Sequence, residues 1–281
     1  MRRLPRTLIV TPTYNELANL PRFVAGVRSA APEAHLLIVD DNSPDGTGAL
    51  ADAIAARDGR VSVLHRAGKM GLGTAYLDAF RQGLAQGYER FFEMDADLSH
   101  DPRYLPRLFA ALDRGVDVVI GSRNVPGGGV EGWGPLRHLI SKGGSLYSRA
   151  VLGVALRDLT TGYKGFSRRA LEAIGLSNVR SNGYSFQIEM TYRALRAGLS
   201  VVEEPIRFVD RVQGQSKMSA RIFAEALGVV WQLRAQVEAK GTESVEEYGA
   251  PTPSVLAPRA RPPLGSSAPA DCSAPADCAA E

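Results

Sequence analysis

The chain has 281 residues, 44% of them hydrophobic and 22% charged, and its formal net charge of +3 is too small to indicate a nucleic-acid partner. No apolar run approaches the roughly 20 residues that span a bilayer, and both cysteines lie near the C-terminus, which excludes a transmembrane segment and a disulfide framework. We therefore expect a cytoplasmic protein, peripheral at the cytoplasmic face of a membrane if it contacts one.

Strands and helices are predicted to alternate along the first 120 residues. Each predicted strand is a short apolar run, the pattern of strands buried on both faces of a parallel sheet. The predicted strands are 7–10, 36–39, 61–64, a run from 91 that carries two acids, and 116–120, and the predicted helices are 20–29, 47–56, 72–86 and 102–114. This alternation predicts an α/β, Rossmann-like fold with a mainly parallel sheet flanked by helices.

The pattern changes in the second half of the chain. Residues 126–134 are glycine-rich, and we expect a mobile loop there. After it we predict helices at 135–152, 169–174 and 184–197, a loop and strand at 158–166, and strand segments within 201–209. From residue 241 onward Pro, Ala, Ser and Glu dominate, which predicts disorder. We therefore expect a single catalytic domain at 1–240 and a disordered tail at 241–281.

A polar loop at 210–217 precedes a predicted amphipathic helix at 219–238. Its apolar stripe consists of Ile222, Phe223, Ala226, Leu227, Val230, Trp231 and Leu233. Such a helix can lie in a membrane interface, where basic residues meet anionic headgroups. The alternative is that the stripe packs on the catalytic domain or on a partner protein.

Acidic residues lie at the carboxyl ends of three of the predicted strands, at Glu16, Asp41 and the pair Asp95 and Asp97. The carboxyl ends of parallel strands meet at one edge of a sheet, where ligands bind, so these acids should converge. Two carboxylates one residue apart repel each other unless a cation or a proton lies between them. Mg²⁺ or Mn²⁺ commonly binds one or two carboxylates together with substrate phosphates. The alternative for the pair is a solvated turn with helix-capping acids.

Seven motifs in order resemble the polyprenol (dolichol) phosphate mannosyltransferases, which are inverting family 2 glycosyltransferases of the GT-A fold. The resemblance spans roughly residues 7 to 238. The motifs are Pro-Thr-Tyr-Asn-Glu at 12–16, Asp-Asp-Asn-Ser-Pro-Asp-Gly-Thr at 40–47, Asp-Ala-Asp-Leu-Ser-His at 95–100, Gly-Ser-Arg at 121–123, Asp-Leu-Thr-Thr-Gly at 158–162, Gly-Tyr-x-Phe-Gln at 183–187 and Asp-Arg-Val-x-Gly-x-Ser-Lys at 210–217.

The resemblance implies a role for each matching position. The nucleoside of the sugar donor would contact Pro12, Tyr14, Glu16, Val39 and Asp41. Asp95 and Asp97 would hold Mg²⁺ or Mn²⁺ on the donor diphosphate, with Ala96 beside them. Arg123, Arg211 and Lys217 would neutralise phosphate on the donor or the acceptor, and Arg137 would join Arg123 at the lipid phosphate. Asp97, Arg123 and Arg211 would be the catalytic residues. Some relatives have Gln where this chain has Ser99, so Ser99 is left out of the metal ligands.

The activity implied by the resemblance is transfer of mannose from GDP-mannose to a polyprenyl phosphate, with inversion at the sugar. The alternative within enzymes is a polyprenyl-phosphate glucosyltransferase or a related family 2 transferase that uses a UDP-sugar. A nucleotide-binding scaffold without catalysis is a further alternative, which the intact acid pair disfavours. A dinucleotide enzyme is disfavoured because the first strand-to-helix turn has no Gly-x-Gly-x-x-Gly.

Overall fold

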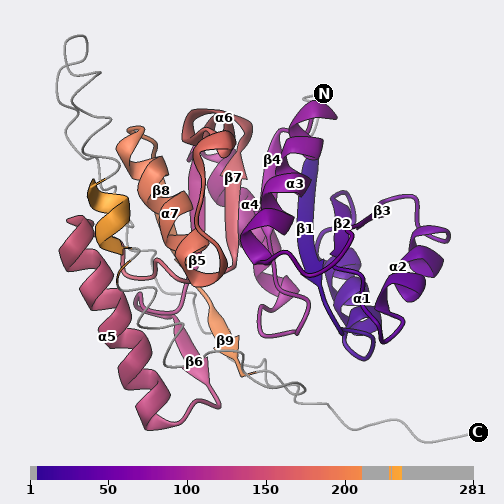
Figure 1. Cartoon of the computed structure of the whole chain (residues 1–281), viewed down its shortest axis with the longest axis horizontal. Helices are drawn as coiled ribbons and strands as arrows, with labels where there is room; N and C mark the ends of the chain where they lie inside the picture. Colours follow the sequence, from indigo (N-terminus) through magenta and orange to yellow (C-terminus); the bar gives the residue numbers. More distant parts are fainter. Residues whose placement is uncertain (1–4, 211–227, 229, 236–281) are drawn as a thin grey trace, which may run out of the picture.

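The computed structural model describes residues 5–210, 228 and 230–235 of the 281-residue chain. Strands and helices alternate through its first half, as the sequence predicts (Figure 1). Seven strands form the main sheet: β1 (Thr7–Thr13), β2 (His35–Asp40), β3 (Val61–His65), β4 (Arg90–Glu93), β5 (Val118–Ser122), β7 (Lys164–Ser167) and β8 (Val201–Pro205).

The strand order of this sheet is β3-β2-β1-β4-β7-β5-β8. Strand β7 is antiparallel to both of its neighbours, and the other pairs are parallel. The mainly parallel sheet is therefore confirmed. The chain moves outward from β1 to β2 and β3, and then returns to β4 on the other side of β1. Such a reversal opens a crevice at the carboxyl ends of the strands, which is where α/β proteins bind ligands.

Helices cover both faces of the sheet. One hydrophobic cluster joins the sheet to α3, α6 and α7, and a second joins its other face to α1, α2 and α4. Side chains alternate along a strand, so in β1 Leu8 and Val10 belong to the first cluster and Ile9 to the second. The helix bounds are α1 (Leu20–Ala30), α2 (Thr47–Ala55), α3 (Leu72–Ala85), a 3₁₀ turn η1 (Pro102–Tyr104), α4 (Leu105–Asp113), α6 (Arg168–Ile174), a second 3₁₀ turn η2 (Leu176–Asn178) and α7 (Gly183–Arg196).

Two elements differ from the sequence prediction. Strand β4 ends at Glu93, so Asp95 and Asp97 lie on the turn after the strand and not on the strand itself. The glycine-rich segment 126–134, expected to be a mobile loop, contains β6 (Gly129–Glu131), which pairs in parallel with β9 (Arg207–Val209). This pairing depends on a partner almost 80 residues away, which local composition does not reveal.

Helix α5 (Pro135–Leu152) lies beside β6, on the side of the molecule away from α2 and β3 (Figure 1). Its C-terminal residues form a third cluster with α7 and with Val230 and Leu233, which are 1% and 3% exposed. For these two residues of the predicted stripe, the packing alternative is confirmed. Trp231 is 56% exposed, and Ile222, Phe223, Ala226 and Leu227 lie outside the described residues.

None of the described helices is both long enough and apolar enough to cross a membrane. The tail at 241–281 also lies outside the described residues, as does most of the predicted loop and helix before it. The boundary at residue 240 therefore stays a prediction.

Candidate active site

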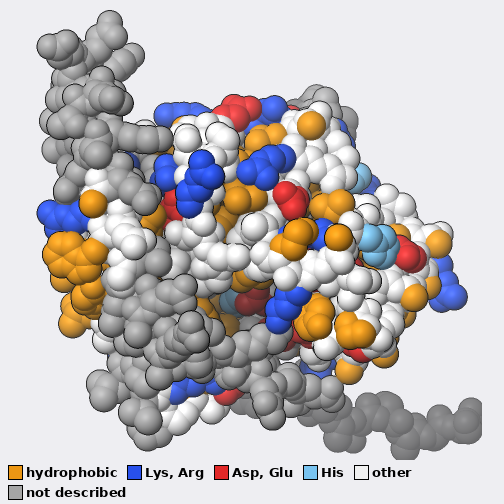
Figure 2. Space-filling view, viewed as in Figure 1, with side chains coloured by type: hydrophobic (Ala, Val, Ile, Leu, Met, Phe, Trp, Pro, Cys, Tyr) orange, Lys and Arg blue, Asp and Glu red, His pale blue; other side chains and the backbone are white. Residues whose placement is uncertain are grey.

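A cleft of about 400 Å³ opens at the carboxyl ends of β1, β2 and β4. Figure 2 shows acidic side chains within a hollow on this face of the molecule. The acids predicted to converge, Glu16, Asp41, Asp95 and Asp97, all line the cleft. Further lining comes from the other predicted site residues Pro12, Tyr14, Ala96, Arg123 and Arg137.

The loop after β1 forms one wall of the cleft. The backbone N–H of Glu16 donates to the Thr47 hydroxyl at the start of α2 (3.0 Å), and the Glu16 carboxylate accepts from the Asn19 side chain (2.8 Å). These bonds tie the loop to two helices. Val39 does not line the cleft: its side chain is fully buried, because it belongs to the cluster in which α3 packs on this face of the sheet.

Asp41 follows β2 and is 6% exposed. Its Oδ1 lies 3.0 Å from Nη1 of Arg66, a buried arginine just after β3. Burial raises the pKa of Asp41 above its ordinary value, and the Arg66 guanidinium opposes that rise. Sequence reasoning found Asp41 through its motif but not Arg66, which belongs to no motif.

The acid pair lies at the centre of the cleft. Asp97 is nearly buried, and its Oδ1 accepts from both the backbone N–H (3.0 Å) and the hydroxyl (2.5 Å) of Ser99. Asp95 is more open to solvent, and its backbone N–H donates to Nδ1 of His100 (3.3 Å). The His100 ring packs against Tyr163. The serine of this motif therefore holds the Asp97 carboxylate, and the histidine holds the backbone at Asp95.

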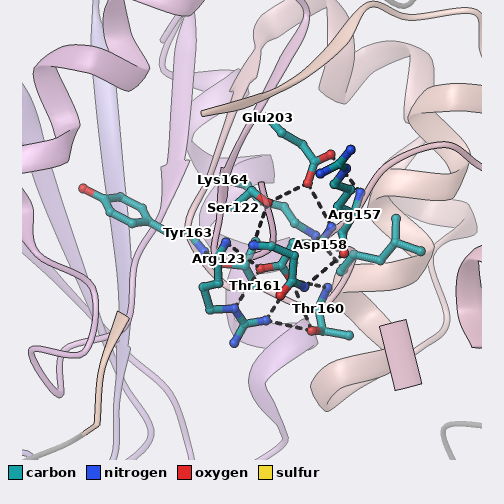
Figure 3. Close-up of polar contacts among 11 residues, drawn as sticks. Ser122, Arg123, Arg157, Asp158, Thr160, Thr161, Tyr163, Lys164 and Glu203 are labelled. Atoms are coloured by element: carbon teal, nitrogen blue, oxygen red, sulfur yellow. Dashed lines mark hydrogen bonds and ion pairs between the residues drawn. The ribbon is translucent and has the colours of Figure 1, made fainter. Parts of the chain in front are cut away.

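Arg123, at the end of β5, is held by a buried ion pair (Figure 3). Its Nε and Nη2 donate to the two carboxylate oxygens of Asp158, each at 2.7 Å, and Nη2 also donates to Thr160 (2.9 Å). Burial alone would raise the pKa of Asp158, but the Arg123 guanidinium outweighs it and holds the pKa below its ordinary value. Glu203 extends the network by accepting from Ser122 (2.7 Å). Arg123 thus reaches the cleft with its orientation fixed by a bidentate contact.

Removing the Arg123 cation should destabilise the fold, because Asp158 is 0% exposed and would be left as an uncompensated buried charge. We expect Arg123→Met to lower the free energy of unfolding by about 3–5 kcal/mol in urea titrations. The double variant Arg123→Met/Asp158→Asn removes both charges and should recover part of that loss. A double variant that is less stable than the single one would contradict this account of the pair.

Arg137, on α5, also lines the cleft. Its Nη1 donates to both carboxylate oxygens of Asp210 (3.0 and 2.8 Å), and its guanidinium lies 4.3 Å from the ring centre of Trp133. A cation over an indole face is a favourable arrangement. Trp133 thus lines the cleft and contacts the basic side chain of Arg137.

Two helices supply another part of the cleft wall. Their lining residues are Ser141, Gly144, Ser145 and Ser148 on α5, and Gly183, Tyr184, Gln187 and Ile188 on α7. Tyr184 and Gln187 belong to a motif quoted from the sequence, but the residues of α5 carry no such signal. Arg211 and Lys217 lie outside the described residues, so their roles in phosphate binding stay predictions.

The chain belongs to glycosyl transferase family 2, whose model matches residues 8–175, and it is a glycosyltransferase. It is 51% identical over 241 residues to polyprenol monophosphomannose synthase of Mycolicibacterium smegmatis, covering 85% of this chain and 91% of that protein. It is also 51% identical to undecaprenyl-phosphate mannosyltransferase of Micrococcus luteus, covering 83% of this chain and 96% of that one. The resemblance drawn from the motifs is confirmed.

Solved structures support the GT-A-like fold. A mannosyltransferase from Pyrobaculum calidifontis, in complex with GDP-mannose and Mn²⁺, matches with a TM-score of 0.52 and 15% identity over 85% of this chain and 76% of that one. Glucosyl-3-phosphoglycerate synthase from Mycobacterium tuberculosis matches with a TM-score of 0.58 and 19% identity over 82% and 80%. At such identities the likeness shows the fold and not the substrate.

Proposed function

We propose that this chain transfers mannose from GDP-mannose to the phosphate of a polyprenyl phosphate and releases GDP. The observation that carries the proposal is the 51% identity, over more than four-fifths of each chain, to two enzymes named for mannosyl transfer to polyprenyl phosphates. The cleft supports it, because acids and arginines from four separate motifs line one cavity. A sugar nucleotide and an anionic acceptor both need such a mixture of charges.

Asp95 and Asp97 would hold the metal, Mg²⁺ or Mn²⁺. Both are hard oxygen donors and both line the cleft, which fits such an ion. The described residues contain no group of three or more His, Cys, Asp or Glu side chains placed for a metal, so the donor diphosphate would supply further ligands. When bound, the metal offsets the charge that builds on the leaving diphosphate.

The donor would lie between the β1 loop and the acid pair. Pro12, Tyr14, Glu16 and Asp41 would contact the nucleoside, and the Ala96 backbone would lie beside the diphosphate. All of them line the cleft. We leave the Val39 side chain out of this set, because the core buries it.

The acceptor phosphate would bind Arg123 and Arg137, whose guanidinium groups suit phosphate oxygens. Arg211 and Lys217 would add positive charge from the segment after Asp210. An oxygen of the lipid phosphate attacks C1 of the mannose, the bond from C1 to the β-phosphate oxygen breaks, and its electron pair leaves with GDP. The attacking phosphate is already anionic near neutral pH, so the step needs orientation more than a strong base. One displacement inverts the anomeric carbon.

A donor panel tests this function. The purified chain is incubated with Mg²⁺ or Mn²⁺, a polyprenyl phosphate and either GDP-mannose, UDP-glucose or UDP-galactose, and organic extracts are examined by mass spectrometry. We expect a mannolipid from GDP-mannose and little product from the UDP-sugars. A glucolipid from UDP-glucose with no mannolipid would overturn the proposal and favour the UDP-sugar alternative.

The acceptor is a lipid, so we propose that the protein works at the cytoplasmic membrane surface. Figure 2 shows hydrophobic side chains at the outer edge of the molecule over α5. Leu146 of this helix is 64% exposed, and Trp231 on the helical segment packed against α5 is also exposed. We expect Trp231→Glu to reduce co-sedimentation with anionic vesicles and to leave hydrolysis of the soluble donor unchanged. The control is Leu17→Glu, which places the same charge on an exposed leucine of the β1 loop. Tyr147→Glu would not be suitable, because Tyr147 packs against the third hydrophobic cluster. Equal sedimentation of wild type and Trp231→Glu would contradict a docking role for this residue.

A further inference from the structure

Arg66 is a buried arginine that the mechanism above does not use, and it contacts Asp41, a residue that lines the cleft. Its guanidinium, just after β3, contacts the end of β2 and helix α3. Nη1 lies 3.0 Å from Oδ1 of Asp41 after β2, Nη2 donates to the Thr74 hydroxyl of α3 (2.6 Å), and Nε lies 3.6 Å from the Asp78 carboxylate one turn further along α3. Nη1 also donates to the carbonyl of Gly71 (3.4 Å). The side chain is 3% exposed, so this guanidinium is fixed on several sides and does not reach into solvent.

Asp41 is therefore an acceptor with a fixed direction. Its carboxylate lines the cleft. Oδ1 is buried and in ion-pair contact with Arg66, so Oδ2 is the oxygen left for a ligand in the cleft. A carboxylate oxygen has two lone pairs, so Oδ2 can accept from two neighbouring donors.

Guanine and uracil differ in the hydrogen-bond donors that they would offer to Asp41. Guanine offers two neighbouring donors, N1–H and the 2-amino group, and both can donate to the two lone pairs of one oxygen. Uracil offers one donor, N3–H, between two carbonyl oxygens, so an oxygen placed to accept from two neighbouring donors would meet one uracil carbonyl and repel it. Lys69, whose Nζ lies 4.7 Å from the Tyr14 ring centre at the cleft wall, can donate to the carbonyl of either base. The discrimination therefore depends on how Asp41 is held.

We propose that Arg66 is a positioning residue that orients Asp41 toward the paired N–H donors of guanine and thereby selects guanosine over uridine sugar nucleotides. This inference rests on the proposed function and deepens it, because it names the residue that decides the donor base. Arg66 would touch no atom of the donor.

Inosine diphosphate provides the direct probe, because it differs from GDP only in lacking the 2-amino group. We measure inhibition of mannosyl transfer by GDP, IDP and UDP for wild type, Arg66→Met and Asp41→Asn. Wild type should bind GDP about tenfold or more tightly than IDP, as expected for one hydrogen bond to a charged group. In Arg66→Met this ratio should fall toward one, KM for GDP-mannose should rise, and kcat should change much less.

The matched control is Arg81→Met. Arg81 is also an arginine near Asp78 (3.3 Å), but it is half exposed and has no contact with Asp41, so its GDP to IDP ratio should stay at the wild-type value. The double variant Arg66→Met/Asp41→Asn should have a GDP to IDP ratio no lower than that of Asp41→Asn alone. If Arg66→Met does not fold, Arg66→Lys keeps the charge without the planar fork and should show a smaller loss of discrimination.

Two failures can be told apart. A wild-type protein that binds UDP as tightly as GDP would overturn the proposed donor itself. A wild type that prefers GDP, together with an Arg66 variant that is folded and keeps the full GDP to IDP ratio, would overturn the role of Arg66 and leave the proposed function standing.

Discussion

Asp97→Asn should lower the turnover number for mannosyl transfer by about 10²–10³-fold at saturating Mg²⁺ or Mn²⁺, a loss comparable to removing one preorganised group that stabilises developing charge. Asparagine keeps the shape and an acceptor oxygen for the Ser99 N–H and hydroxyl, so the turn after β4 should persist. What the substitution removes is the negative charge that would hold the metal. Initial rates across a metal titration measure the effect, and thermal unfolding checks the fold.

Ser99→Ala is the matched control for this variant. It deletes a hydroxyl that contacts the same Asp97 oxygen but leaves both carboxylates in place. We expect a far smaller loss of rate. Near wild-type turnover in Asp97→Asn, or an equal loss in both variants, would show that the charge of Asp97 is not what the reaction needs.

Lys164→Met should destabilise the protein by about 3–5 kcal/mol near pH 8, because it leaves the fully buried Glu93 without its counter-charge. The Lys164 ammonium also donates to the Gln187 carbonyl (2.6 Å) and the Thr191 hydroxyl (2.9 Å), so its loss disconnects β7 from α7. Burial raises the pKa of Glu93 to about 7, although the positive charge of Lys164 opposes this rise. Burial lowers the pKa of Lys164 to about 8, although the negative charge of Glu93 opposes this fall.

The sign of the pH dependence follows from these values. In the variant the pKa of Glu93 should rise further, so the folded state keeps a proton that the unfolded chain releases above its ordinary pKa. The free energy of unfolding must then fall as the pH rises. In wild type the fall due to Glu93 ends near pH 7, and in the variant it continues to higher pH. The loss relative to wild type should be larger at pH 8 than at pH 5, by on the order of 1 kcal/mol.

Thr191→Val serves as the control for Lys164→Met, because it removes one hydrogen-bond partner of the ammonium and no charge. Its loss of stability should be about 1 kcal/mol and nearly the same at both pH values. Urea unfolding at pH 5 and pH 8 provides the comparison. A loss in Lys164→Met that does not grow with pH would contradict the electrostatic coupling between the buried Glu93 and Lys164.

The strands and helices of the first half could be predicted because each strand is a local apolar run and each helix has its own apolar stripe. The convergence of Glu16, Asp41, Asp95 and Asp97 could also be predicted, since parallel strands bring their carboxyl ends to one edge. The end of β4 could not be predicted, because the acid pair is compatible both with the end of a strand and with the turn after it.

What sequence reasoning missed depends on contacts between distant segments. The pairing of β6 with β9 joins residues almost 80 positions apart and turns a glycine-rich segment into a strand. Arg66 and Lys164 look like ordinary basic residues in the sequence, and only the fold surrounds them with Asp41 and Glu93. Val39 was assigned to the nucleoside through the family resemblance, but its side chain is fully buried in the cluster between the sheet and α3.

The anomeric configuration of the product tests the central claim most directly. Wild-type protein is incubated with GDP-α-mannose, a polyprenyl phosphate and Mg²⁺ or Mn²⁺, and the purified lipid is examined by carbon and phosphorus NMR. We predict a mannose whose C1 is coupled to phosphorus and has the β configuration, as a single displacement by the lipid phosphate requires. An α-linked product, or a sugar that is not joined to phosphate, would contradict the account.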